Sequence, residues 1–273
     1  MLSIAQLQSV ADEIQSARDG TRQLQPFSAR LPGFDLGAAY AAAALGHQAR
    51  LARGERPVGR KLGFTNPDMW DLHGVRAPVW AWLYEDSVSQ LTSGSAVCSL
   101  SRFAEPRIEP EIVFGLRATP PARADEAALL ACIEWVAHGF EIVQSHFPGW
   151  RFEAADTVVD QALHGTLLIG APLSPAALGP DPATALRDFR VELCCDGAPR
   201  ETGQGSNVLG SPLAALGHLV ELLAGEPSAP ALQPGDIVTT GTLTTALPVR
   251  PGERWSTALR GIALPGLEVE FKP

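Results

Sequence analysis

The first 56 residues show the hydrophobic spacing of two helices. Over residues 3–20, apolar side chains recur every three to four positions, and Ser3 can cap the start of such a helix. A second helix is predicted from Leu36 to Ala52, because Asp35 is a favourable N-cap and an alanine-rich run follows it. These two elements predict a helical N-terminal segment over residues 1–56.

From residue 57 onward, the pattern changes to short runs of β-branched and aromatic residues separated by glycine and proline. Helical spacing returns at two places, Asp125–Ala137 and a helix that begins at Ser211. Because strands dominate and the helices come at irregular intervals, the pattern favours an α+β fold with a mixed sheet over a regular doubly wound fold. Strands are predicted at residues 58–65, 108–116, 140–143, 167–170, 189–195, 237–242, 255–259 and 267–271.

The chain has 273 residues, of which 45% are hydrophobic, so it can build a sizeable core. Its 26 glycines and 23 prolines indicate many turns and short strands rather than a helical bundle. This length suits one large domain, with or without a helical appendage. We therefore expect residues 57–273 to form a mixed-β domain that is continuous with the N-terminal segment.

The formal net charge is −9 and no basic stripe is visible, so nucleic acid is not an expected partner. No basic amphipathic segment suggests binding to anionic lipid, and no apolar run has the length of a transmembrane span or a signal peptide. The four cysteines contain no C-x-x-C pair. We expect a soluble, reduced, cytoplasmic protein without a membrane partner.

Two glutamates interrupt the apolar run at residues 107–114. Side chains two apart on a strand point to the same face, so Glu109 and Glu111 would lie together, opposite Ile108 and Ile112. Two like charges on a largely apolar strand are unfavourable unless a cation lies between them. A divalent metal ion is the natural candidate, and a solvent-facing acidic strand is the alternative.

Glu141 and Lys61 extend this candidate site. Glu141 lies in a similar apolar run, and three carboxylates would form an all-oxygen site of the kind that Mg²⁺ or Mn²⁺ prefers. A substrate with adjacent keto and carboxylate oxygens could chelate such an ion, which would stabilise a developing enolate. Lys61, between two glycines, could hold an anionic substrate, or transfer protons if its pKa were lowered. The alternative for Lys61 is an ordinary surface lysine at a turn.

Other catalytic motifs are weaker. The six histidines form no H-x-x-x-H pair, so a histidine metal site is not expected. His164 is the histidine that we place nearest the pocket, and a hydrogen-bonded core histidine is the alternative. No serine has the context of a nucleophile elbow, and the Gly203-x-Gly205 turn lacks the third glycine of a dinucleotide-binding motif.

Six segments in register resemble the 2-keto-4-pentenoate hydratase / 4-oxalocrotonate decarboxylase family, which belongs to the wider fumarylacetoacetate hydrolase-like group. Each segment alone is a weak signal, but their order and approximate spacing agree over nearly the whole chain. The segments are Gly59–Thr65, Arg107–Ile112, Phe140–Val143, Asp156–Asp160, Gly203–Leu213 and Gly235–Thr242.

The resemblance implies a role for each matched residue. It makes Glu109, Glu111 and Glu141 the ligands of Mg²⁺ or Mn²⁺, and Lys61 the active-site lysine. The implied fold is a mixed β-sheet roll or sandwich of the fumarylacetoacetate hydrolase C-terminal type with flanking helices. It is usually assembled as a homo-oligomer, which can also form a complex with a neighbouring enzyme of the pathway. The residues implied in substrate binding and catalysis around the metal are Phe64, Gln161, His164, Thr240, Gly241 and Thr242.

The implied activity is a metal-dependent lyase that adds water to a 2-hydroxy-2,4-dienoate from meta-cleavage of aromatic compounds. A decarboxylase of the 4-oxalocrotonate type is the alternative on the same metal site. A C–C hydrolase would need a histidine base, for which His164 is a rough candidate, and a non-catalytic partner subunit is a further alternative. Two departures leave the reaction open: Val79 replaces an acidic residue of hydratases, and His164 replaces a small one.

Overall fold

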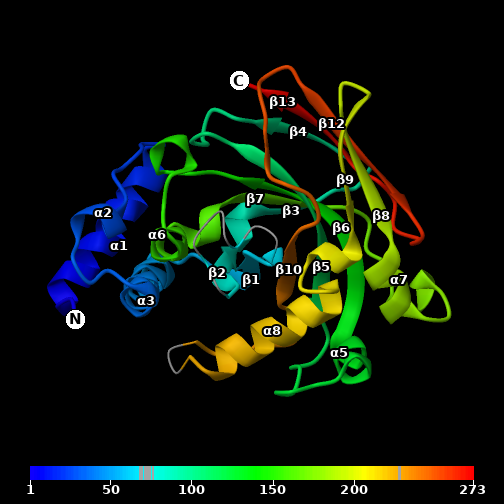
Figure 1. The fold of residues 1–273 in the computed structure, drawn as a ribbon, viewed down its shortest axis with the longest axis horizontal. Coiled ribbons are helices and arrows are strands. Elements are labelled where there is room, and N and C mark those ends of the chain that lie inside the picture. Colours follow the sequence, from blue (N-terminus) through cyan, green and yellow to red (C-terminus); the bar gives the residue numbers. More distant parts are fainter. Residues whose placement is uncertain (68–69, 71–74, 76, 227–228) are drawn as a thin grey trace.

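The computed structural model describes residues 1–67, 70, 75, 77–226 and 229–273. Its strands form two sheets, with helices packed around them (Figure 1). The helices are α1 (Ile4–Asp19), α2 (Phe27–Arg30), α3 (Leu36–Ala52), α5 (Glu126–Cys132), α6 (Ala154–Val159), α7 (Pro182–Asp188) and α8 (Pro212–Ala224). The strands are β1 (Pro57–Gly63), β2 (Val79–Tyr84), β3 (Val88–Gln90), β4 (Ser95–Ser99), β5 (Arg107–Leu116), β6 (Ile133–Val143), β7 (His164–Ile169), β8 (Arg190–Cys195), β9 (Ala198–Gln204), β10 (Ile237–Thr242), β11 (Leu247–Pro248), β12 (Arg254–Arg260) and β13 (Glu268–Lys272).

Both sheets are mixed. The larger has eight strands in the order β2-β1-β10-β5-β6-β7-β3, and β11 pairs with β5 beside this path. Its β1–β10 and β3–β7 pairs are parallel, while β5 pairs antiparallel with both β10 and β6. The smaller sheet has five strands in the order β4-β13-β12-β8-β9. Two mixed sheets with flanking helices confirm the predicted α+β fold class.

One face of the larger sheet packs on α8, the long helix that crosses beneath it in Figure 1. Ile112 and Phe114 point from β5 into a fully buried cluster that includes Leu216 of α8. The side chain of Ser211 accepts a hydrogen bond from the Ala214 N–H, so the helix begins where the sequence predicts. This packing fixes which face of β5 is apolar.

The same face continues beyond α8 to the smaller sheet. Ile108 of β5 and Phe140 of β6 are fully buried against Leu193, Trp255 and Phe271. The two contacts together cover the even-numbered side chains of β5. The odd-numbered side chains, including the two glutamates, are therefore left for the opposite face.

The N-terminal helices share a cluster with later parts of the chain. Val10 and Ile14 of α1 and Ala39 of α3 pack with Val79 of β2 and Val158 of α6. Figure 1 shows these blue helices gathered at one end of the larger sheet. The bounds of α1 and α3 agree with the predicted helices to within one residue. The N-terminal segment is thus packed directly against the β-rich part.

The predicted helix over Asp125–Ala137 is wrong in its second half. The helix α5 ends at Cys132, and β6 then runs from Ile133 to Val143 without a break at Gly139. Ile133, Trp135 and Val136 are β-branched or aromatic residues, which favour a strand when a neighbouring strand such as β5 is available for pairing. The alanine and leucine residues before them dominated the sequence signal.

One helical stretch among the described residues, Gly205–Ala224, is long and apolar enough to cross a membrane by length and composition alone, and half of it is buried inside the fold. It contains α8, whose leucines belong to the core cluster beneath the larger sheet. A buried core helix passes the same test, and the packing of α8 is of that kind.

Candidate metal centre

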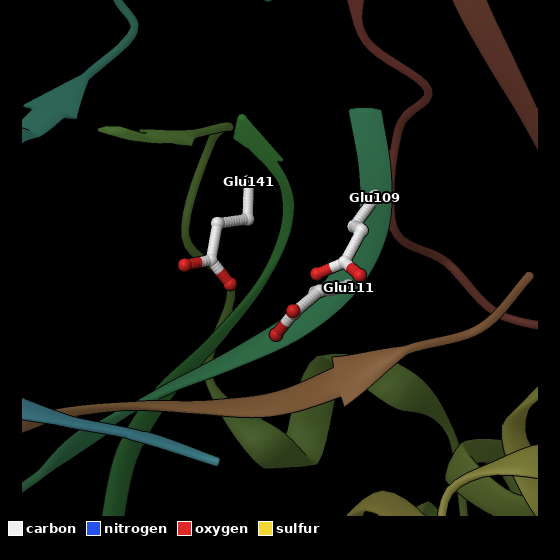
Figure 2. Close-up of side chains that lie close together, drawn as sticks. All are labelled: Glu109, Glu111 and Glu141. Atoms are coloured by element: carbon white, nitrogen blue, oxygen red, sulfur yellow. The ribbon is translucent and has the colours of Figure 1, made fainter. Parts of the chain in front are cut away.

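The strand register brings three carboxylates together. Glu109 and Glu111 alternate onto one face of β5, and Glu109 lies directly opposite Glu141 in the antiparallel β5–β6 pair. One carboxylate oxygen from each residue lies within 4.8 Å of the others. Figure 2 shows the three carboxyl groups converging from these two strands. The predicted alternation of the two β5 glutamates is confirmed, and we call the three residues the carboxylate cluster.

Lys61 lies beside the carboxylate cluster. Its Nζ is 2.9 Å from Glu141 Oε1 and 3.8 Å from Glu109 Oε2, and its side chain is 3% exposed. Arg60 points to the other side of β1, where its guanidinium stacks over Trp82. The predicted alternation on β1 is therefore confirmed, and Lys61 is a buried residue rather than a surface lysine at a turn.

The pKa values of the cluster reflect burial first and then the charges of its neighbours. Burial raises the pKa of Glu109 to about 7 although Lys61 opposes it, and burial with the neighbouring glutamates raises the pKa of Glu111. Burial would also raise the pKa of Glu141, but Lys61 and His164 hold it at about 2. Burial alone would lower the pKa of Lys61, but the three glutamates outweigh it and raise that pKa. The lowered lysine pKa considered from the sequence is therefore not found.

The carboxylate cluster fits a divalent cation. Glu111 Oε1 and Glu141 Oε2 are buried and find no hydrogen-bond partner among the described residues. Buried polar atoms are normally paired, and leaving a charged one unpaired is costly. When all three carboxylates are ionised, one lysine leaves net negative charge in the interior. An all-oxygen donor set of this kind suits a hard ion such as Mg²⁺ or Mn²⁺.

Neighbouring groups hold the carboxylates in place. The Gly241 N–H donates to Glu111 Oε2 at 2.9 Å. Gly241 has φ of +94°, and a Cβ there would lie 1.8 Å from the Thr65 hydroxyl, so only glycine fits. His164 Nδ1 donates to Glu141 Oε1 at 2.6 Å, and its Nε2 is 2.8 Å from the Ser87 hydroxyl. Two of the three carboxylates are thus oriented by specific hydrogen bonds.

A cavity of about 180 Å³ opens above Lys61 and Glu109; we call it the site cavity. Arg107 and Trp150 stand together in its lining, with the guanidinium 4.0 Å from the indole ring. Threonines line another part of the wall. The site cavity therefore joins a charged floor to a largely apolar wall, whose members include Val79, Val143, Phe152, Ala162 and Leu163.

Not every predicted pocket residue lines the site cavity. Phe64, Gly241 and Thr242 do so, together with Lys61. Thr240 does not, although it is two positions from Thr242, because the strand is irregular at Gly241 and its register with β5 shifts between Thr239 and Thr242. Its fully buried side chain points away from the cavity, and its hydroxyl donates to the Ile112 carbonyl.

Gln161 and His164 also lie outside the lining of the site cavity. Gln161 lines a separate cavity beneath the N-terminal helices. His164 is 1% exposed and has both ring nitrogens in hydrogen bonds, so it lies beside the carboxylate cluster rather than facing substrate space. Of the segment around Val79, residues 74 and 76 lie outside the described residues, and Val79 itself is buried in the cavity wall.

Several site residues were missed from the sequence. Arg107 precedes Glu109 by two positions, so the alternation that paired the glutamates could have placed it on the same face. Trp150 and Phe152 lie in an irregular segment that gave no periodic signal. Ser87 is 77 residues from His164 in the chain, and nothing in the sequence links them.

The chain is similar to known proteins over most of its length. The chain is 28% identical over 272 residues to a 2-keto-4-pentenoate hydratase of Paraburkholderia xenovorans, covering 98% of this chain and 95% of that protein. It is 30% identical over 203 residues to a 4-oxalocrotonate decarboxylase of a Pseudomonas species, covering 74% and 75%. The solved structure of a 4-oxalocrotonate decarboxylase from Pseudomonas putida G7, complexed with magnesium and adipate, superimposes with a TM-score of 0.90 at 24% identity, covering 99% of both chains.

A family model adds the final comparison. The model of the fumarylacetoacetate (FAA) hydrolase C-terminal family matches residues 69–265, which include all three members of the carboxylate cluster. The chain therefore belongs to the fumarylacetoacetate hydrolase C-terminal family.

Proposed function

We propose that this protein is a divalent-metal-dependent hydratase that adds water to a 2-hydroxy-2,4-dienoate. The observation that carries the proposal is the carboxylate cluster, with two partnerless buried oxygens beside a lysine at the floor of a cavity. Relatives named as hydratases of such substrates match almost the full length of the chain, which supports the choice of reaction.

Glu109, Glu111 and Glu141 would hold the ion, for which Mg²⁺ and Mn²⁺ are the best candidates. When bound, the ion supplies Lewis-acid polarisation of the adjacent keto and carboxylate oxygens of a 2-oxo acid. Gly241 keeps one Glu111 oxygen engaged, and His164 does the same for one Glu141 oxygen. The remaining oxygens of these two carboxylates are the atoms that lack partners.

Lys61 would hold the anionic end of the substrate and carry a proton. Its raised pKa keeps the ammonium group charged at neutral pH, so it acts as a hydrogen-bond and proton donor at Nζ. It is placed at the cavity floor next to Glu109, where an anionic head group would arrive. His164, with both nitrogens engaged, would orient Glu141 rather than serve as the base of a C–C hydrolase.

The apolar wall would receive the hydrocarbon part of the dienoate. Val79, Phe152 and Leu163 line the site cavity opposite its charged floor. Burying the carbon chain there orients it and keeps bulk water away from most of its length. Thr242, beside Gly241, would supply a hydroxyl on the polar side of the same cavity.

A 4-oxalocrotonate-type decarboxylase is the second candidate. Arg107 favours it, because this guanidinium lies in the cavity lining, stacks on the Trp150 ring and donates to the Ala246 carbonyl. The charges of Glu105 and Glu109 act on it, but among the described residues it forms no ion pair with either. The second carboxylate of such a substrate could pair with Arg107. Valine at position 79 also fits this alternative, since it removes one candidate acid.

The activity test uses two substrates. Chelator-treated protein is supplied with Mg²⁺ or Mn²⁺ and given 2-hydroxypenta-2,4-dienoate or 4-oxalocrotonate in separate reactions. Loss of the dienoate absorbance without CO₂ identifies a hydratase, whereas CO₂ release from 4-oxalocrotonate identifies a decarboxylase. Glu111→Gln should abolish either activity, and Glu134→Gln, on the exposed side of β6, should not. Full activity in Glu111→Gln would contradict the metal site.

We also propose a homo-oligomer, as the family resemblance implies. Analytical ultracentrifugation at several protein concentrations tests this expectation. A single species with the mass of one 28.9 kDa chain would contradict it.

A further inference from the structure

The segment that carries His164 to the carboxylate cluster has an unusual backbone. Three consecutive residues, Gln161, Ala162 and Leu163, have φ values of 53°, 48° and 65°. Residues other than glycine rarely adopt this left-handed region, because Cβ approaches the backbone there. Such a conformation persists only where its surroundings hold it. The contacts around this left-handed turn therefore decide where His164 lies.

Arg18 of α1 holds both ends of the turn. Its Nη1 donates to the Asp160 carbonyl at 3.2 Å and to Asp160 Oδ1 at 2.9 Å. Its Nη2 donates to the His164 carbonyl at 2.9 Å. The Asp160 side chain is fully buried and also pairs with His146, so it is a fixed anchor for the arginine. One guanidinium thus bridges the residues immediately before and after the three strained positions.

Ala162 and Leu163 are buried, but the turn borders a cavity on each side. Ala162 and Leu163 line the site cavity, whereas Gln161 and Arg18 line a second cavity of about 210 Å³ between the N-terminal helices and β2. The left-handed turn is therefore a thin wall between two cavities. Two backbone bonds also hold the turn, from the Leu163 N–H to the Asp160 carbonyl at 2.9 Å and from the Gln144 N–H to the Leu163 carbonyl at 2.8 Å. The three hydrogen bonds from Arg18 add a side-chain bridge between its two ends.

His164 connects the left-handed turn to the carboxylate cluster. Its Nδ1 is 2.6 Å from Glu141 Oε1, and its Nε2 is 2.8 Å from the Ser87 hydroxyl. A shift of the His164 backbone would lengthen at least one of these bonds and leave Glu141 held chiefly by Lys61, which is 2.9 Å from the same oxygen. Groups that orient a metal ligand in this way set its affinity for the ion.

We propose that Arg18 is a positioning residue: it fixes the left-handed turn so that His164 orients Glu141 toward the divalent ion. This inference rests on the proposed function, because it takes the carboxylate cluster as the ion site. Arg18 is absent from the lining of the site cavity and acts through the turn. The N-terminal helix α1 thereby contributes to the metal site without touching it.

The test measures Mn²⁺ affinity by isothermal titration calorimetry on the full chain. Arg18→Gln should raise the Kd for Mn²⁺ by about tenfold, the lower end of the range for groups that orient metal ligands. Arg18→Lys keeps the charge but cannot make the forked contacts, so it should also weaken binding, and it carries the test if the glutamine variant does not fold. Arg30→Gln is the control, because the contacts of Arg30 do not reach the left-handed turn: an ion pair with Glu13, a hydrogen bond to the Gln25 carbonyl and stacking on the Phe27 ring.

A double variant shows whether Arg18 acts through His164. If it does, Arg18→Gln combined with His164→Asn should bind Mn²⁺ no more weakly than His164→Asn alone. Losses that multiply, or an unchanged Kd with only a lower melting temperature in a folded Arg18 variant, would overturn the proposal. If wild-type protein bound no Mn²⁺, the proposed function itself would fail, which is a distinguishable result.

Discussion

Replacing Glu109 by glutamine isolates the electrostatic cost of the carboxylate cluster in metal-free protein. Burial raises the pKa of Glu109 from 4.5 to about 7, and Lys61 only partly opposes this. The unfolded chain therefore loses this proton at lower pH than the folded protein, so the free energy of unfolding falls as pH rises from 4.5 through 7. The gap between the two pKa values corresponds to about 3 kcal/mol. Glutamine cannot ionise, so Glu109→Gln should escape this loss.

Other groups do not reverse the comparison. Glu109 contributes to the raised pKa of Glu111, so its replacement lowers that pKa and acts in the same direction. The pKa of Glu141, held at about 2, gives stability that is lost only as pH falls from 4.5 toward 2, below the relevant range. Burial lowers the pKa values of His47 and His138 to about 4, which costs stability below pH 6.5. These histidines are the same in both proteins, so they cancel when the variant is compared with wild type.

The assay is urea unfolding in chelator at pH 5, 6, 7 and 8. The free energy of unfolding of Glu109→Gln relative to wild type should grow by about 3 kcal/mol over this range. Glu134→Gln, exposed on β6, should show a difference that is independent of pH. With saturating Mg²⁺ the order should reverse, because the ion stabilises the intact cluster more than the variant. A difference for Glu109→Gln that stays flat or shrinks as pH rises would refute the reasoning.

Three further predictions concern the pocket and its supports. Gly241→Ala should cost about 1–3 kcal/mol of stability by calorimetry and weaken Mn²⁺ binding, because its Cβ would strike Thr65; Gly252→Ala, with similar φ and open space, separates the clash from the backbone penalty. Phe152→Ala should enlarge the site cavity at its apolar wall, so the ratio of kcat/KM for a dienoate with a bulkier substituent to that for 2-hydroxypenta-2,4-dienoate should rise by about tenfold or more. An unchanged ratio would exclude that wall as the substituent site. Arg107→Gln should lower CO₂ release from 4-oxalocrotonate while sparing hydration of 2-hydroxypenta-2,4-dienoate, so equal losses on both substrates would argue against a carboxylate-pairing role.

Local sequence patterns predicted the elements correctly where pairing with distant strands did not override the local preference. Helices α1, α3 and α8 start at capping residues, and their starts were correctly predicted. The helix at residues 125–137 failed because the strand β6 is set by pairing with β5, which lies beyond any local window. Residues 154–159 form α6 although no helix was predicted there, since the segment is short and its burial comes from packing with α1 and α3.

The site residues also divide into those that a local pattern could predict and those that depend on distant parts of the chain. Glu109 and Glu111 share a strand, so alternation alone placed them together. Glu141 and Lys61 were candidates from their own sequence context, and the family resemblance assigned their roles. Their position beside β5 could not be derived, because strand order cannot be read from one sequence. Gln161 was assigned to the wrong cavity, since three left-handed residues reverse the direction of the chain there and no glycine signals it. The hydrogen bonds of Arg18 join residues 142 and 146 positions apart and left no trace in the sequence.

The direct pairing of Glu109 with Glu141 has a consequence for assembly of the sheet. A slip of one residue between β5 and β6 would turn the side chains of one strand to the other face. It would place a glutamate in the apolar layer against α8 and the smaller sheet, and it would separate the three carboxylates. An ion that needs all three oxygens would bind only the correctly aligned pair of strands. Metal present during refolding would then stabilise the correct register of β5 and β6 selectively. It would raise the yield of correctly paired sheet in the absence of substrate.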